Sequence, residues 1–206
     1  MFNKITDYFG RKDSNRWIFI VILIMAAVGL LAAFVLSVDA IVLAKDPSVG
    51  LSCNLNTVIS CGRVAGTVYA SLFGFPNSFI GLMSEPVFIT VAIAGLCGVK
   101  FPRQFMFAVQ VMAVFSMLFA YYLFHISLFT IHALCPWCLS VDVVTIIMFF
   151  ALTRYNVNED NLYLSKKTST YIKSFIQKDY DKFAAASLIV IGIAMIIIVF
   201  GQSLFA

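Results

Sequence analysis

Five long apolar runs, separated by shorter polar segments, dominate the chain. They cover roughly Trp17–Val38, Pro76–Cys97, Gln104–His125, Pro136–Leu152 and Phe183–Leu204. A helix needs about 17–25 mostly apolar residues to cross a bilayer, so each run predicts a transmembrane helix. The fourth run is the shortest, and it crosses only if its helix begins at or just before Cys135. The pattern predicts an all-α integral membrane protein.

Composition supports this class. The chain is 62% hydrophobic and 12% charged, whereas a soluble domain has about 45–50% apolar and about 25% charged residues. The longest breaks, 40–75 and 153–182, leave little room for a soluble domain. The first run is longer than the apolar part of a secretory signal and lacks a small-residue cleavage site, which favours an uncleaved helix.

The basic residues predict the orientation of the helices. Twelve of the 14 Lys and Arg residues lie before the first run, between the second and third runs, or between the fourth and fifth. Only Lys45 and Arg63 lie in the alternate segments. Cytoplasmic loops carry the excess of Lys and Arg, so we expect a cytoplasmic N-terminus and an external C-terminus. This distribution gives no indication of a nucleic-acid partner.

That orientation brings four of the five cysteines to one face. Cys53 and Cys61 lie in the 40–75 loop, and Cys135 and Cys138 lie where the fourth helix begins. We expect this face to be external, where disulfides persist. Cys97, near the inner end of the second helix, is expected to be a small buried or lipid-facing residue.

The Cys135–Cys138 pair suits redox exchange better than the other roles of a Cys-x-x-Cys motif. A zinc site needs more ligands in a closed tetrahedron, and a c-type haem needs histidine where Leu139 stands. A static bridge across three residues closes almost no loop and adds little stability. Pro136 is suited to the first helical position, so Cys135 falls at a helix N-terminus, where the helix dipole favours its thiolate.

The 40–75 loop is not strongly polar, and its apolar residues recur at roughly helical spacing. They are Leu51, Leu55, Val58, Ile59, Val64, Val68, Tyr69, Leu72 and Phe73. We therefore expect a short helix that lies on the bundle with its apolar face down. Cys53 and Cys61 either pass electrons by thiol–disulfide exchange or form a permanent bridge, and their spacing does not decide between the two.

Three motifs carry a resemblance to a known family. "SCNLNTVISCGRV" at 52–64, "PNSFIG" at 76–81 and "CPWCL" at 135–139 resemble the vitamin K epoxide reductase family from about Trp17 to Leu152. The resemblance implies a catalytic four-helix bundle around a quinone over 1–152, with the outer cysteine loop at 40–75. Residues 153–206 would then form a cytoplasmic connection and a fifth transmembrane helix.

The resemblance also implies roles for individual residues. Cys53 would meet the thiols of a partner, Cys61 would exchange with Cys135, and Cys138 would lie beside the quinone ring. Asn77 would hydrogen-bond a quinone carbonyl, which we favour over the alternative that this residue, which follows Pro76, is a helix N-cap. Thr67 matches a family hydroxyl near the reactive cysteines.

Two intramembrane carboxyls depart from a plain apolar helix. Asp142 stands four residues after Cys138, where the vertebrate enzymes have a tyrosine that contacts the substrate. A carboxyl at this depth is costly and therefore a functional candidate, as a proton relay or as a hydrogen-bond partner of a neighbouring helix. For Glu85 three roles remain open: pairing with His125, bonding a backbone group, or lying near the quinone.

Asp142 favours a bacterial disulfide-forming member of the family over epoxide chemistry. We therefore expect a thiol:quinone oxidoreductase of the bacterial inner membrane, which uses ubiquinone or menaquinone and no metal. Because the chain stops at Ala206, its thioredoxin-like periplasmic partner is expected to be a separate protein. The alternatives are quinone or epoxide reduction for its own sake, and a non-catalytic scaffold or transporter with structural disulfides.

Overall fold

The computed structural model describes residues 2–51 and 53–204, without the side chains of residues 2–14 and 202–204. Lys4, Arg11 and Lys12, which entered the prediction of orientation, have their side chains outside this described part. Five helices are long and apolar enough to cross a membrane. They belong to α1 (Phe2–Lys45), α3 (Ser78–Leu96), α4 (Arg103–Ile126), α5 (Pro136–Asn158) and α7 (Tyr180–Leu204). The predicted all-α membrane fold with five spans is confirmed.

Two helices are longer than predicted. The first runs past Val38 to Lys45, because residues 39–45 are compatible with a helix. It stops before Pro47, since a proline disfavours the helical conformation in the residue before it. The fourth runs past Leu152 to Asn158, since no glycine or proline interrupts it. A further amphipathic helix, α6 (Lys166–Gln177), forms in the connection before α7.

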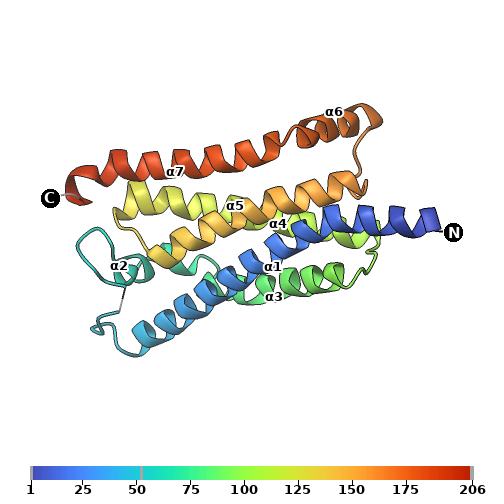
Figure 1. Ribbon diagram of the computed structural model, residues 1–206. Coiled ribbons are helices and arrows are strands. Elements are labelled where there is room, and N and C mark those ends of the chain that lie inside the picture. Colours follow the sequence, from blue (N-terminus) through green and yellow to red (C-terminus); the bar gives the residue numbers. More distant parts are fainter. Residues whose placement is uncertain (1, 52, 205–206) are drawn as a thin grey trace.

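α1 is the central helix of the bundle and packs against both α3 and α5. α4 packs against α5, and the π-helical turn η2 (Ser127–Ile131) continues it. α7 lies along α5 at the outside of the bundle (Figure 1). Its outward side chains are apolar, and Ile198 is 82% exposed. Apolar side chains in this position are expected of a helix that faces lipid.

The packed core fills only one half of the bundle. It joins one face of each of the four helices α1, α3, α4 and α5. Its members are Ile18, Phe19, Ile22, Ala26, Phe88, Val91, Ala92, Met106, Val109, Ala113, Val144, Met148, Leu152 and Tyr155. Gly95 allows close contact here, since a Cβ on it would lie 2.5 Å from ring carbons of Phe19. This half therefore holds the helices together.

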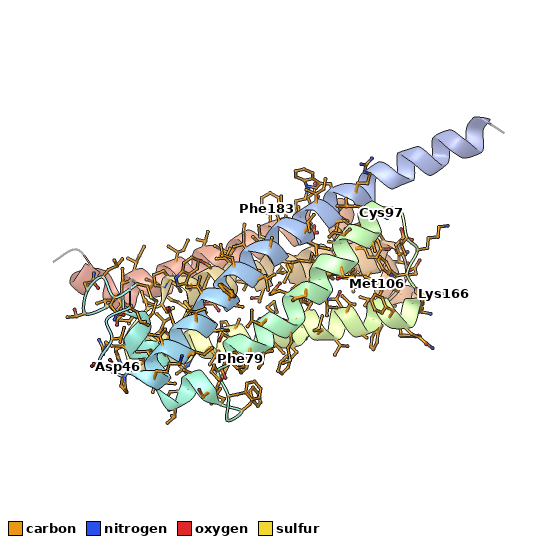
Figure 2. The ribbon with its side chains drawn as sticks, turned by 90° about the horizontal axis from the view of Figure 1, so that it is seen from below. Asp46, Phe79, Cys97, Met106, Lys166 and Phe183 are labelled. Atoms are coloured by element: carbon orange, nitrogen blue, oxygen red, sulfur yellow. A yellow bond between two sulfur atoms is a disulfide. The ribbon has the colours of Figure 1, made fainter. Side chains whose placement is uncertain are left out.

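Polar contacts reinforce the same half of the molecule. Asn156 is fully buried, and its amide donates to Gln110 Oε1 at 2.9 Å. Arg154 bonds both Asp179 and Asp181, which ties α5 to the start of α7. Figure 2 shows Cys97 and Lys166 toward this end of the bundle, whereas Asp46 lies at the opposite end. We call the opposite end, which carries Cys53, Cys61, Cys135 and Cys138, the cysteine end.

Candidate redox site

Asparagine side chains organise the loop at the cysteine end. Asn56 Oδ1 accepts hydrogen bonds from the backbone amides of Val58 and Ile59. Asn54 Oδ1 accepts from the Gly62 amide at 2.9 Å and from the Ser60 hydroxyl at 3.0 Å. Asparagine commonly stabilises turns in this way. The two residues thus fold the segment between Cys53 and Cys61 back on itself.

An isolated parallel β-bridge then joins this loop to the segment before α5. It pairs Ile59 with Leu134. The Leu134 amide donates to the Val58 carbonyl at 2.8 Å, and the Ser60 amide donates to the Leu134 carbonyl at 2.9 Å. Because the two segments run parallel, the residues that follow the bridge, Cys61 and Cys135, emerge next to each other.

The sulfur atoms of three cysteines are in contact at this point. Cys53 and Cys61 form a disulfide, and the Cys135 Sγ lies 3.3 Å from the Cys61 Sγ. Cys61 and Cys135 are each 1% exposed. Cys53 is 9% exposed, so the residue expected to meet a partner is covered in this state.

Cys135 occupies the N-cap position of α5, and Pro136 begins the helix. The backbone amide of Cys138 donates to Cys135 Sγ at 3.4 Å. A hydrogen bond from the Cys138 thiol, supported by backbone amides, lowers the pKa of Cys135, although burial and the nearby charge of Asp39 oppose the shift. Lower thiol pKa means more thiolate, which is the nucleophile in disulfide exchange.

A cavity of about 660 Å³ opens directly behind these sulfurs. It occupies the half of the bundle that the packed core does not fill. Cys61, Cys135 and Cys138 line it, and so do Asn77, Thr67 and Asp142. Most of the other lining residues are apolar. The four side chains nominated for the quinone from the sequence, which are Asn77, Thr67, Asp142 and Cys138, therefore border one space together with Cys61 and Cys135.

Asn77 and Thr67 hold the rim of the cavity. Asn77 precedes α3 but makes no side-chain cap bond. Instead its amide donates to the Tyr69 carbonyl at 2.7 Å, and its Oδ1 accepts from the Leu72 amide at 3.1 Å. An amide nitrogen has two N–H groups, so one is left for a bound molecule. The Thr67 hydroxyl donates to the Val64 carbonyl at 2.8 Å.

The buried carboxyls are placed differently from each other. Asp142 lines the cavity one turn beyond Cys138. Glu85 lines it from α3, is 4% exposed, and its Oε2 has no hydrogen-bond partner among the described residues. It lies against Gly29 of α1, where a Cβ would approach its carboxyl group to 2.8 Å. His125 is exposed and packs on Phe129, so the suggested Glu85–His125 pair is not present.

The predicted helix over the 40–75 loop is largely wrong. Among the described residues between α1 and α3, only α2 (Cys61–Ala65) and a short 3₁₀ turn, η1 (Val68–Ser71), are helical. Leu51 and Val58 are buried, but Leu55 is 69% and Val68 is 79% exposed. The asparagine side chains and the β-bridge satisfy the backbone here, so the apolar spacing did not have to form a helix.

One residue near the sulfurs was missed. Asp39, on α1, has its Oδ2 3.8 Å from the Cys53 Sγ. Its carboxylate and the sulfurs of Cys53 and Cys61 all lie within 4.8 Å of one another. The available signal was a carboxyl inside the apolar sequence "LSVDAIVL" of the first span, since such groups are costly and commonly functional.

The sequence model of the vitamin K epoxide reductase family matches residues 20–153, which is more than half of the chain. No curated protein matches the chain. The matched segment begins in α1 and ends in α5, so it contains all four cysteines of the cysteine end and the whole cavity.

Proposed function

Because the chain belongs to the vitamin K epoxide reductase family, we propose that this membrane oxidoreductase is a thiol:quinone oxidoreductase. In this proposal it reoxidises a separate thioredoxin-like protein and so drives disulfide formation in exported proteins. Electrons pass from Cys53 and Cys61 to Cys135 and Cys138, and from these to a membrane quinone, either ubiquinone or menaquinone.

The observation that carries the proposal is the position of Cys135. Its sulfur is 3.3 Å from Cys61 Sγ on one side, and on the other side it borders the cavity. Thiol–disulfide exchange requires a thiolate to reach a disulfide sulfur directly. A purely structural bridge between Cys53 and Cys61 would have no need of a third sulfur at this distance.

The cavity suits a quinone ring. Ligand sites of about 300–1,000 Å³ are mostly apolar with a few polar groups that fix orientation, and this one measures about 660 Å³. Asn77 retains one N–H donor at the rim. Deeper, the Glu85 carboxyl has an unpartnered oxygen, which a hydrogen bond to a quinone oxygen would satisfy.

The cavity also has a side at which the prenyl tail of a quinone can leave it. α3 packs on α1, while α4 packs on α5, and aromatic rings of both sides border the cavity between them. Phe75, Phe115 and Phe119 line this side, and Phe115 stacks on Phe119 with ring centroids 5.8 Å apart. We propose that the tail leaves the cavity here and enters the lipid.

When bound, a quinone supplies a two-electron, two-proton acceptor. The residues of the chain supply the electron donor, which is the Cys135–Cys138 thiol pair. The helix N-terminus and the Cys138 amide favour the thiolate form of Cys135, and Cys138, three residues further along α5, also lines the cavity. Formation of the Cys135–Cys138 disulfide from the Cys135 thiolate and the Cys138 thiol releases two electrons and one proton. The carboxyls of Asp142 and Glu85 line the cavity, so they are the groups that can hold that proton and pass on the second one, taken up from water, that a quinone requires.

We propose the orientation that the basic residues predict. The cysteine end faces the periplasm, and the N-terminus lies in the cytoplasm of a bacterial cell. Membrane-impermeant maleimide, added to intact cells that carry Leu55→Cys in a cysteine-free background, should label that cysteine without detergent, because Leu55 is 69% exposed in the loop at the cysteine end. Labelling only after permeabilisation would reverse the orientation and remove the basis for a periplasmic partner.

Anaerobic quinone reduction tests the activity. The dithiothreitol-reduced full-length protein, freed of reductant, should reduce short-tailed menaquinone or ubiquinone. Cys138→Ala should abolish this reaction, whereas Cys97→Ala, which changes an exposed cysteine at the far end, should not. An unchanged quinone spectrum with the wild-type protein would support the non-catalytic alternative and refute the proposal.

A second assay tests the order of transfer. Cys53→Ala and Cys61→Ala should prevent oxidation of a reduced thioredoxin, while dithiothreitol still drives quinone reduction through Cys135 and Cys138. Equal loss of both activities would contradict the assigned order.

A further inference from the structure

Asp39 is the described carboxylate closest to the disulfide. It lies on α1 six residues before the helix ends at Lys45. Its Oδ2 is 3.8 Å from Cys53 Sγ, and Cys61 Sγ lies within 4.8 Å of the same carboxylate. Leu36, Val42 and Leu43 of α1 pack around the same sulfurs, so the helix holds the carboxylate in place.

Three ionisable side chains lie near Asp39 among the described residues. Cys53 and Cys61 belong to the loop, and Cys135, whose pKa the charge of Asp39 raises, stands at the start of α5. None of the ion pairs in the described part of the chain involves Asp39. Asp39 is also only partly buried, so it can exchange a proton with water. A carboxylate without a cationic partner is free to accept a proton.

We propose that Asp39 is the proton acceptor for Cys53 in the disulfide exchange at the cysteine end. The inference rests on the proposed function. It concerns the step in which the Cys53 thiol attacks Cys61 within a Cys61–Cys135 mixed disulfide. The Cys53 proton passes to Asp39 Oδ2, the Cys53–Cys61 bond forms, and the Cys61–Cys135 bond breaks.

The electron pair of the broken bond leaves on Cys135, whose thiolate the start of α5 stabilises. No outside oxidant or reductant is needed, because one disulfide replaces another. Asp39 then loses its proton to water. In the reverse direction the same carboxyl donates a proton to the departing Cys53, as microscopic reversibility demands.

The size of the effect follows from the ionisation of an ordinary thiol. With a pKa of about 8.5, a cysteine is only about 3% thiolate at pH 7, so a base can accelerate its attack by up to about 30-fold. This acceleration must vanish at a pH well above the pKa of the thiol, where the thiol is already ionised without a base. Asp39→Asn should therefore slow the resolution of the mixed disulfide by up to about 30-fold at pH 7 and hardly at all near pH 10.

The experiment uses the full-length protein in detergent with reduced thioredoxin as donor and short-tailed menaquinone as acceptor. Acid quenching and mass spectrometry measure the Cys61–Cys135 species, which should accumulate in Asp39→Asn at pH 7. Asp46→Asn is the matched control, because Asp46 lies on the same end but its carboxylate bonds only Ser48. Asp39→Glu, which restores a carboxylate, should recover most of the rate.

Dithiothreitol-driven quinone reduction separates the possible failures. If wild-type protein cannot reduce quinone at all, the proposed function fails. If wild type is active and Asp39→Asn keeps the wild-type rate and pH profile with thioredoxin, the role of Asp39 is refuted. Loss of both the thioredoxin and the dithiothreitol reactions in Asp39→Asn would also refute it, because it would show a structural role.

Discussion

Replacing Glu85 by methionine should stabilise the protein and weaken its quinone binding. Glu85 is 4% exposed, and its Oε2 has no partner among the described residues. Leaving a buried polar group unsatisfied costs about 1–3 kcal/mol. Methionine is of similar length and needs no hydrogen bond, so Glu85→Met should gain about 1–3 kcal/mol. At about 2–4 °C per kcal/mol for a chain of this size, Tm should rise by about 2–12 °C.

The same substitution at Gln110 is the matched control. Gln110 is 6% exposed, but its Nε2 donates to Thr153 and its Oε1 accepts from Asn156, both at 2.9 Å. Gln110→Met removes both bonds and leaves the amide of the fully buried Asn156 without its shorter hydrogen bond. Its Tm should therefore fall. Thermal unfolding of the quinone-free protein in detergent, followed by tryptophan fluorescence, measures both variants.

Quinone kinetics complete the test of Glu85. A single hydrogen bond contributes about 0.5–1.5 kcal/mol, so the menaquinone KM of Glu85→Met should rise about 2- to 13-fold. Glu85→Gln retains an N–H donor and should keep a KM near that of wild type. A lower Tm for Glu85→Met would refute the claim that the carboxyl is unsatisfied. An unchanged KM would separate Glu85 from the quinone.

Two further predictions concern the cysteine end. Because hydrogen bonds lower the pKa of Cys135, its thiolate should persist as the pH falls below the usual thiol value of about 8.5. The 240-nm absorbance difference between wild type and Cys135→Ser should show a midpoint below that value, and a midpoint at or above it would contradict the N-cap geometry. Asn77→Ala removes the bonds to Tyr69 and Leu72, so hydrogen exchange at the Leu72 amide should become faster and the menaquinone KM should rise. Thr67→Ala, which removes one bond to Val64, should have a smaller effect, and the reverse order would be inconsistent with Asn77 holding the rim.

Local features of the sequence were sufficient to predict the helices and the start of α5. The length and apolarity of each run decide whether a segment can span a membrane. Pro136 after Cys135 indicates a helix start whatever packs against it, and the structure places Cys135 at the N-cap. The boundaries were less certain, because α1 and α5 continue through residues that tolerate helix outside the bilayer as well as inside it.

The loop shows where periodicity failed. Its apolar residues recur at helical spacing, yet Leu55 and Val68 are exposed. Backbone amides of Gly62 and Val58 donate hydrogen bonds to the side-chain oxygens of Asn54 and Asn56, which satisfied the loop without a helix. The alternative role of Asn77 as a helix cap is not seen either, because its side chain bonds Tyr69 and Leu72 in the preceding turn instead.

The sequence by itself determined a five-helix membrane protein with paired cysteines at one end, because hydropathy, charge bias and capping depend on neighbouring residues. Only the tertiary structure decided which groups meet. The contact between Cys61 and Cys135 joins residues 74 positions apart, and it depends on the register of a single β-bridge. The placement of Asp39 beside Cys53, and of Glu85 against Gly29, depends on how α1 is rotated against its neighbours. Such distances arise from packing between distant segments, and no local pattern encodes them.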